Sequence, residues 1–323
     1  IWPYSELTTD QMRKNPKYLD SIGFYRGLSP DKFIYARVMA RLGRRLTVKK
    51  RTAESAAAFY EAFRVTEQPT AKSDFLESYY LAFTESKQTF FPPGLSAMAS
   101  ETLLRMQIIE RGLPPKKQRV PVFEPVLRDV ATSQHTSAEA TKRKEDFAAA
   151  ARAYEDYLYV YAKSKYTADM KTNLASSRFH ADMKIEAAQI YASLAKSVKD
   201  QARAKEHMGS ALQSLVGALS DLLKLTPLQK HQGRELFKVT AQSFIRSFPQ
   251  DPSVMDIRFN ASKILYDERN FKSAVENLRK YIRLYPKSPR VQEAGLLLLD
   301  CFYQEDRLQD LLAEGKQLMS NSD

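Results

Sequence analysis

The stretch "FPQDPSVMDIRFNASKILYDERNF" at residues 248–271 is the most informative part of the sequence, because "YPKSPRVQEAGLLLLDCFYQEDRL" at 285–308 repeats it 37 residues later. Matching positions carry the same residue or the same kind of residue. The pairs are Pro249 with Pro286, Pro252 with Pro289, Val254 with Val291, Asp256 with Glu293, Tyr266 with Tyr303, Glu268 with Glu305, and Phe271 with Leu308. An internal repeat of this length predicts a chain built by stacking copies of one structural unit.

Each copy of the repeat predicts two helices joined by a short polar turn. The apolar residues of 254–265 recur at helical spacing, and so do those of 271–285, where Pro286 ends the pattern. Asp251 and Ser253 are both suitable N-caps for the first helix, and the sequence does not choose between them. One hairpin cannot bury both apolar stripes, so neighbouring hairpins must stack into a solenoid. The next hairpin is expected from Arg290 to about Met319.

A second match extends the repeat toward the front of the chain. "DFAAAARAYEDYLYVYAKS" at 146–164 aligns with "NFKSAVENLRKYIRLYPKS" at 270–288. An aromatic residue opens the second helix at Phe271, a small residue follows at Ala274, and Pro286 closes the unit. These features resemble the tetratricopeptide repeat, whose usual period is about 34 residues. The resemblance covers 147–319, and its aromatic-Pro-x-x-Pro tail is similar to repeats of bacterial cell-envelope proteins.

Composition supports an all-α chain of helical hairpins. The 323 residues include only 10 glycines, and alanine, leucine and lysine are abundant. No apolar run approaches the roughly 20 residues that cross a bilayer. The first residue is Ile1 rather than methionine, so we expect that a preceding segment has been removed, which leaves a signal peptide or a lipid anchor open.

Proline content predicts the division into domains. Residues 113–126 contain four prolines and are interpreted as an extended connector, in preference to a segment that docks elsewhere. Thr136 and Glu139 have the spacing of a capping box for a helix that starts there. We therefore expect an N-terminal helical region at 1–112, a Pro-rich connector at 113–135 and a repeat array at 136–323.

A search for catalytic chemistry finds no motif. The sequence has no phosphate-binding loop and no dinucleotide fingerprint, and its four histidines lack metal-ligand spacing. Cys301, the only cysteine, lies in the apolar run "LLLLDCF" and is interpreted as a buried thiol. We expect no catalytic residue, no cofactor and no metal, so the chain is interpreted as a non-enzyme. An enzyme of unfamiliar design is left open, because active sites can assemble from distant residues.

The tetratricopeptide resemblance implies a groove lined by the first helix of each hairpin. It therefore nominates outward positions of those helices as contacts for a protein or peptide partner. These positions are Asn173, Ser177, Asp256, Asn260, Lys263, Asp267, Glu293, Leu297 and Asp300.

Basic residues are concentrated near the front of the chain. Net charge is +12, and residues 37–51 contain seven basic residues and no acidic one. This basic patch consists of Arg37, Arg41, Arg44, Arg45, Lys49, Lys50 and Arg51. Four of the arginines share one helix face by their spacing, with Val38, Leu42 and Leu46 expected to pack inward. A solvated face and an anion-binding surface are both open, the anion being nucleic acid, lipid headgroups or an acidic protein.

Together these features predict a non-catalytic scaffold that binds proteins or peptides, including acidic ones, in a multi-protein assembly. The family resemblance places it in the bacterial cell envelope or periplasm, with the cytoplasm as the alternative location. The alternative function is a helical-repeat nucleic-acid-binding protein that uses the basic N-terminal helix. The late repeats mix acidic and basic residues, which favours the scaffold.

Overall fold

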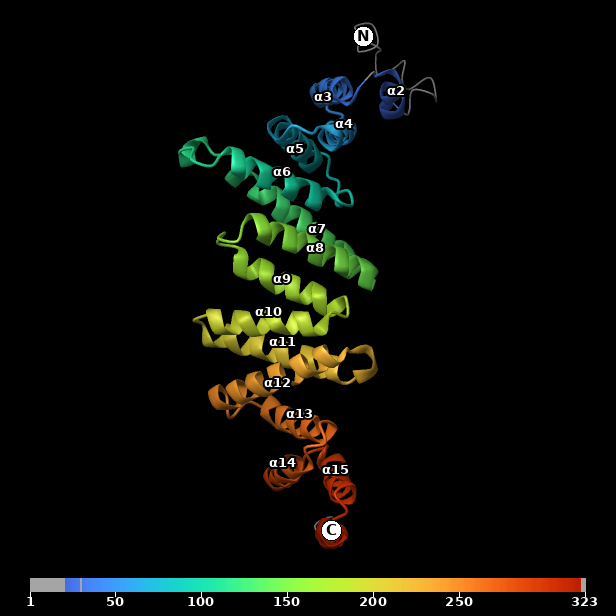
Figure 1. The fold of residues 1–323 in the computed structure, drawn as a ribbon. Coiled ribbons are helices and arrows are strands. Elements are labelled where there is room, and N and C mark those ends of the chain that lie inside the picture. The colour runs from blue at the N-terminus through green and yellow to red at the C-terminus, as the bar shows by residue number, and fades with distance from the viewer. Residues whose placement is uncertain (1–20, 30, 321–323) are drawn as a thin grey trace. The chain divides into compact units, whose positions relative to one another are not determined.

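The computed structural model describes residues 21–29 and 31–320, and within them the chain is helical with no β-strand. Contacts divide the chain into two compact units, one ending at Ser177 and the other starting at Arg178. Within each unit, helices pack mainly on their neighbours in sequence, as Figure 1 shows. This is the packing of a helical-hairpin solenoid, so the predicted all-α fold class is confirmed.

The first unit begins with the helices of the predicted N-terminal region. Its buried side chains include Met39, Phe63, Leu76 and Phe123. Helix α9 contains the boundary between the units. The helices are α2 (Ser21–Leu28), α3 (Lys32–Val48), α4 (Thr52–Val65), α5 (Pro69–Glu85), α6 (Leu95–Ile109), α7 (Glu124–Thr141), α8 (Lys144–Val160) and α9 (Thr167–His180), with 3₁₀ turns η3 (Pro115–Lys117) and η4 (Val120–Phe123).

The second unit contains two hydrophobic clusters that follow one another along the chain. One is centred on Phe237 and Phe244, and the other on Phe259, Leu298 and Phe302. The helices are α10 (Lys184–Ser197), α11 (Gln201–Leu219), α12 (Pro227–Ser247), α13 (Ser253–Asp267), α14 (Phe271–Leu284), α15 (Val291–Gln304) and α16 (Leu308–Ser320), with the 3₁₀ turn η5 (Leu222–Lys224).

The predicted repeat appears as one recurring turn between hairpins. Tyr157 Oη lies 2.9 Å from Ser164 Oγ, and Tyr281 Oη lies 2.6 Å from Ser288 Oγ. Each serine oxygen then accepts a backbone N–H two residues later, at 3.1 Å in both copies. Asp251 takes the place of the serine in a third copy, where its carboxylate accepts the Ser253 N–H at 2.9 Å. Neither of the two predicted N-caps holds that position, because the N-cap of α13 is Pro252, which makes no side-chain cap hydrogen bond, and Asp251 precedes it.

A second recurring turn closes the hairpins. A non-glycine residue adopts the left-handed conformation at Lys50, Asp182, Arg269 and Asp306, with φ between 56° and 68°. At Arg269, the backbone N–H donates to the Tyr266 carbonyl, and the Asn270 N–H donates to the Leu265 carbonyl. The other three turns have the same pair of hydrogen bonds, which is the Schellman motif at a helix C-terminus. The turn at Lys50 joins α3 to α4, ahead of the region in which the sequence repeat was found.

The Pro-rich segment differs from the prediction of an extended connector over 113–135. Residues 124–135 belong to α7, which begins at Glu124, with Pro125 in the first turn, where proline is tolerated. The expected capping box was wrong, because Thr136 lies inside α7 and its hydroxyl donates to the Thr132 carbonyl. The part before α7 forms η3 and η4, and the division into three domains stays a prediction.

Candidate interaction surfaces

The predicted polar positions of α13 form one face of that helix. Asp256, Asn260, Lys263 and Asp267 are spaced by four, three and four residues, so they lie within about 60° of one another around the axis. Lys263 and Asp267 are exposed, Asn260 is half-buried, and Asp256 lies 3.5 Å from Arg290. Reduced hydration raises the pKa of the Asp267 carboxyl, while Lys263 and Arg234 oppose that shift. This face offers amide, ammonium and carboxylate groups to solvent.

Two of the three predicted partner-binding positions on α15 make contacts within the protein itself. Glu293 is exposed, whereas Leu297 is half-buried and packs on the apolar cluster of α13–α15. Asp300 accepts a hydrogen bond from the Tyr266 hydroxyl, which joins α15 to α13. This bond raises the pKa of Tyr266 to about 12, because an ionised tyrosine would face the Asp300 carboxylate. Asp300 therefore stabilises the contact between hairpins and is only half-exposed.

The two predicted positions on α9 are less accessible than an outward face requires. Ser177 is fully buried, and its hydroxyl lies 2.9 Å from His135 Nδ1 on α7. Asn173 is half-buried and hydrogen-bonds Tyr154, whose pKa burial raises to about 12. The expectation that Ser177 points outward was wrong, because its side chain is fully buried and its hydroxyl contacts His135 of α7. The role of these positions in a groove stays a prediction.

The basic patch lies on α3 and the turn that follows it. Arg37, Arg41 and Arg44 are exposed on one face, together with Phe33 and Val48, which are 66% and 84% exposed. The opposite face of α3 packs closely on α4 at Gly43. A Cβ at this position would lie 2.9 Å from the Phe59 ring, which is closer than van der Waals contact allows. Lys49 and Lys50 are exposed, and Arg51 pairs with Glu54 at 2.8 Å.

The residues that are buried on α3 differ in part from those that helical spacing predicted. Arg45 is half-buried near Tyr25, whose pKa is raised by burial, and the charge of Arg45 opposes that rise. Leu46 is buried as predicted, whereas Val38 and Leu42 are only half-buried, and the helix core is formed by Tyr35, Met39 and Gly43 among others. The basic face is thus narrower than predicted and centred on Arg37, Arg41 and Arg44.

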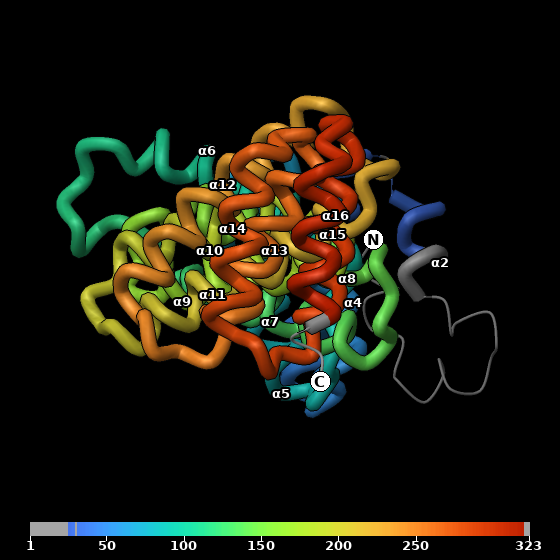
Figure 2. Tube along the Cα trace, turned by 90° about the horizontal axis from the view of Figure 1, so that it is seen from below, coloured from blue at the N-terminus to red at the C-terminus, as the bar shows by residue number. Residues whose placement is uncertain are grey.

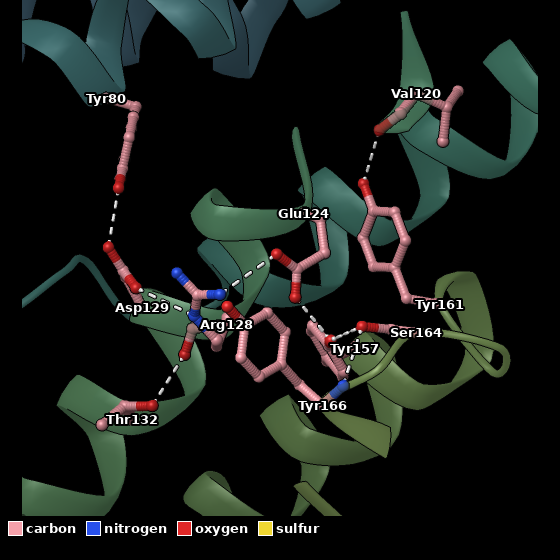
Figure 3. Close-up of polar contacts among 10 residues, drawn as sticks. All are labelled: Tyr80, Val120, Glu124, Arg128, Asp129, Thr132, Tyr157, Tyr161, Ser164 and Tyr166. Carbon is pink, nitrogen blue, oxygen red and sulfur yellow. Dashed lines mark hydrogen bonds and ion pairs between the residues drawn. The ribbon is translucent and has the colours of Figure 1, made fainter. Parts of the chain in front are cut away.

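A polar network that the sequence did not reveal joins α5, η4, α7 and α8 (Figure 3). Glu124 accepts from the Tyr157 hydroxyl at 2.5 Å and from Arg128 at 3.2 Å. The Tyr80 hydroxyl donates to Asp129 at 2.6 Å. Tyr161 donates to the Val120 carbonyl at 2.8 Å, which ties η4 to the end of α8. The helical spacing of Glu124 and Arg128 was the only local sign of this network, because the other contacts are between distant residues.

The chemistry of this network indicates a structural role. Burial and the nearby Asp129 carboxylate raise the pKa of Tyr80 to about 12, and burial and Glu124 do the same for Tyr157. These hydroxyls therefore stay protonated near neutral pH and donate to carboxylates. Arg128 compensates the charge of Glu124, and its guanidinium lies 4.5 Å from the centre of the Tyr166 ring. The arrangement stabilises the packing of the helices and offers no activated nucleophile.

Other candidate sites are weaker. Cys301 is fully buried, as predicted, and burial raises the pKa of its thiol to about 11. A hollow of about 340 Å³ is lined by Met255 and residues 284–289, which include the repeated aromatic-proline pair. Within residues 21–29 and 31–320 there is no group of three or more His, Cys, Asp or Glu that could hold a metal ion. The helices in the same part of the chain are too short or too polar to span a bilayer.

Comparisons with known proteins add little to this description. No family model and no curated protein sequence matches the chain. Among solved structures, the chain is similar to the P58(IPK) TPR domain at 9% identity, over 95% of this chain and 82% of that chain, with a TM-score of 0.26. A likeness at this score carries no argument, so the description of the fold rests on the helices and turns of the chain itself.

Proposed function

We propose that this protein is a non-catalytic scaffold that binds protein or peptide partners along the first helices of its hairpins. The observation that supports the proposal is the polar face of α13, on which Lys263 makes no hydrogen bond or ion pair with other described residues. Asn260 next to it presents an amide that can hydrogen-bond an extended peptide backbone. Groups of this kind on a surface built by stacked hairpins suit recognition of a chain segment.

The test is a double substitution, Asn260→Ala with Lys263→Ala, followed by affinity purification of the full chain and quantitative mass spectrometry. We expect specific partners to be depleted by at least fivefold relative to the unchanged protein. The matched control is Asn277→Ala with Lys280→Ala, which removes the same two residue types from the exposed side of α14. An unchanged set of partners in the first variant would contradict binding at this face.

The basic face of α3 supports a second candidate function, which is binding of an acidic partner or of nucleic acid. Three exposed arginines on one face provide the charge that phosphates or carboxylates require. Changing Arg37, Arg41, Arg44 and Arg45 to glutamate should abolish binding to labelled single-stranded RNA or DNA, with helix content unchanged. A control variant changes the exposed Lys272, Lys280, Arg283 and Lys287 of the second unit to glutamate. Weak binding without a salt dependence would argue against this candidate.

We also infer a location in the bacterial cell envelope. The support is the similarity of the aromatic-Pro-x-x-Pro tail at 248–252 and 285–289 to repeats of envelope proteins. Fractionation of cells that express the tagged natural gene product tests this inference. Recovery of the protein with cytoplasmic markers would overturn it without affecting the scaffold proposal.

A further inference from the structure

The last hairpin of the described chain exposes a row of large apolar side chains. Leu296 and Tyr303 on α15 are 70% and 64% exposed, and Leu308, Leu312 and Met319 on α16 are 53%, 62% and 76% exposed. The two helices lie side by side in Figure 2, and we name these five residues the terminal face. Spacings of four and seven residues place the exposed side chains of each helix on one side of it, and apolar side chains grouped in this way mark a candidate binding site for protein.

The same positions are covered in the preceding hairpin. Each residue of the terminal face has an equivalent 37 residues earlier in the repeat. Leu296 corresponds to Phe259, which is fully buried, and Leu312 corresponds to Val275, which is 4% exposed. The other three equivalents are Tyr266, Phe271 and Ile282, which are half-buried and pack on the apolar cluster. The terminal face therefore repeats a surface that, one hairpin earlier, is an internal helix–helix interface.

The element that covers this surface in the preceding hairpin is α15. It contributes Ala294, Leu298 and Phe302, all fully buried in the cluster shared with α13 and α14. It also contributes Asp300, which accepts from the Tyr266 hydroxyl. The next helix adds Glu314, which pairs with Arg279 of α14. The covering surface is thus apolar with an acidic edge.

We propose that the terminal face binds one amphipathic helix of a partner protein, in the way that α15 packs on α13 and α14. The helix presents apolar residues three and four positions apart. A carboxylate at its edge accepts from the Tyr303 hydroxyl, as Asp300 accepts from Tyr266. This site is distinct from the polar face of α13.

A second copy of the chain is a poorer occupant. The matching surface in a second copy is the inner face of α15, and Ala294, Leu298 and Phe302 are already buried there. Only local unfolding of the last hairpin would expose them. A partner with an uncovered amphipathic helix needs no such change and is therefore the occupant that the packing favours.

The probe in this test is a peptide with the sequence of α15, the helix that covers the equivalent surface of the preceding hairpin. A fluorescein-labelled peptide with the sequence of residues 290–305, carrying Cys301→Ser against disulfide formation, is titrated with the full chain and followed by anisotropy. We expect saturable binding that Leu312→Glu or Met319→Glu weakens at least tenfold. The control is Leu223→Glu, because Leu223 is 97% exposed on η5, outside the terminal face. Since all three side chains are exposed, we expect the melting temperature of each variant to stay unchanged.

Two variants of the peptide test the chemistry of the occupant. Leu298→Glu in the peptide should abolish binding, and Asp300→Asn should weaken it severalfold in the unchanged protein but not in a Tyr303→Phe variant. Absence of saturable binding, or equal binding by the Leu312→Glu variant, would overturn the proposal. Sedimentation showing a dimer that Leu312→Glu dissociates, without peptide binding, would assign the face to a second copy and also overturn it.

Discussion

Two buried tyrosines differ in what their hydroxyl groups contribute to the stability of the fold, because only one hydroxyl has a hydrogen-bond partner. Tyr79 and Tyr281 are 2% and 1% exposed. The Tyr281 hydroxyl has Ser288 as a partner, whereas the Tyr79 hydroxyl is buried among aromatic rings with no hydrogen-bond partner. Burial accordingly raises the pKa of Tyr79 well above its ordinary value. An unpaired buried hydroxyl opposes folding, because it has lost its hydrogen bonds to water.

We therefore expect Tyr79→Phe to increase the free energy of unfolding by about 1 kcal/mol. Tyr281→Phe should lower it by about 1 kcal/mol, since that change removes a hydrogen bond and leaves Ser288 with one partner fewer. Urea unfolding followed by circular dichroism measures both changes. Destabilisation by Tyr79→Phe would show that its hydroxyl has a partner in solution.

At the scale of the element, the hairpin turns carry backbone strain. Lys50, Asp182, Arg269 and Asp306 adopt a left-handed conformation in which their Cβ is crowded. Glycine avoids this crowding and is the usual residue at that position of a Schellman motif. The sequence predicted a short polar turn in each repeat but not its left-handed residue, because none of the four positions has the glycine that normally marks a helix end.

Replacing such a residue with glycine should stabilise the protein. We expect Arg269→Gly to raise the free energy of unfolding by about 1 kcal/mol, because relief of the crowding exceeds the added entropy of the unfolded chain. Lys280→Gly in the middle of α14 is the control and should lower it by about 1 kcal/mol. Thermal melts compare the three proteins, and a lower melting temperature for Arg269→Gly would contradict the assignment of strain.

A carboxylate at another turn makes stability depend on pH. The Lys205 ammonium, with Ser253, lowers the pKa of Asp251 to about 2, from an unfolded value of about 3.9. Because the folded pKa is the lower one, this contribution is complete above about pH 4 and is lost as pH falls toward 2. Asp251→Asn should therefore lower the melting temperature at pH 6, with a difference that shrinks below about pH 3. A difference that stays constant down to pH 2 would exclude this linkage.

At the scale of the whole molecule, packing between sequence neighbours makes stability local. Helices of a solenoid contact mainly the hairpins next to them, so a defect in one hairpin spreads only to its neighbours. Phe302 is fully buried in the cluster of α13–α15, and Phe63 is fully buried in the first unit.

Hydrogen exchange with mass spectrometry can test this locality. Phe302→Ala, which removes a large buried ring at a cost of about 3–5 kcal/mol, should accelerate exchange in α13–α16 and leave α3–α6 unchanged. Phe63→Ala is the reciprocal control and should affect α3–α6 alone. Uniform acceleration throughout the chain by either variant would indicate a single cooperative unit.

The repeat at 248–308 sufficed to predict the helices, the hairpins and the burial of Cys301, because apolar spacing along a helix is a local property. Reasoning from local sequence was wrong at 124–136, where it predicted a connector and a helix start inside what is α7. Pro125 lies in the first turn of that helix and Thr136 in its middle, although both residue types are common where helices begin or end. The candidate site was predicted only in part. The tetratricopeptide resemblance nominated Asp256, Asn260, Lys263 and Asp267, which share one face of α13, but it could not show that Asp300 bonds Tyr266.

The pattern of residues along the chain is enough to predict the all-α hairpin architecture and the basic face of α3. Tertiary packing determines which polar groups bond within the protein. Ser177 bonds His135, and the Glu110 carboxylate accepts from the backbone N–H groups of Arg119 and Val120. Packing also leaves the terminal face exposed among residues 21–29 and 31–320, whereas its equivalent one hairpin earlier is buried or half-buried. The physical reason is that helix formation follows from neighbours in sequence, whereas burial depends on which distant surface packs on that helix.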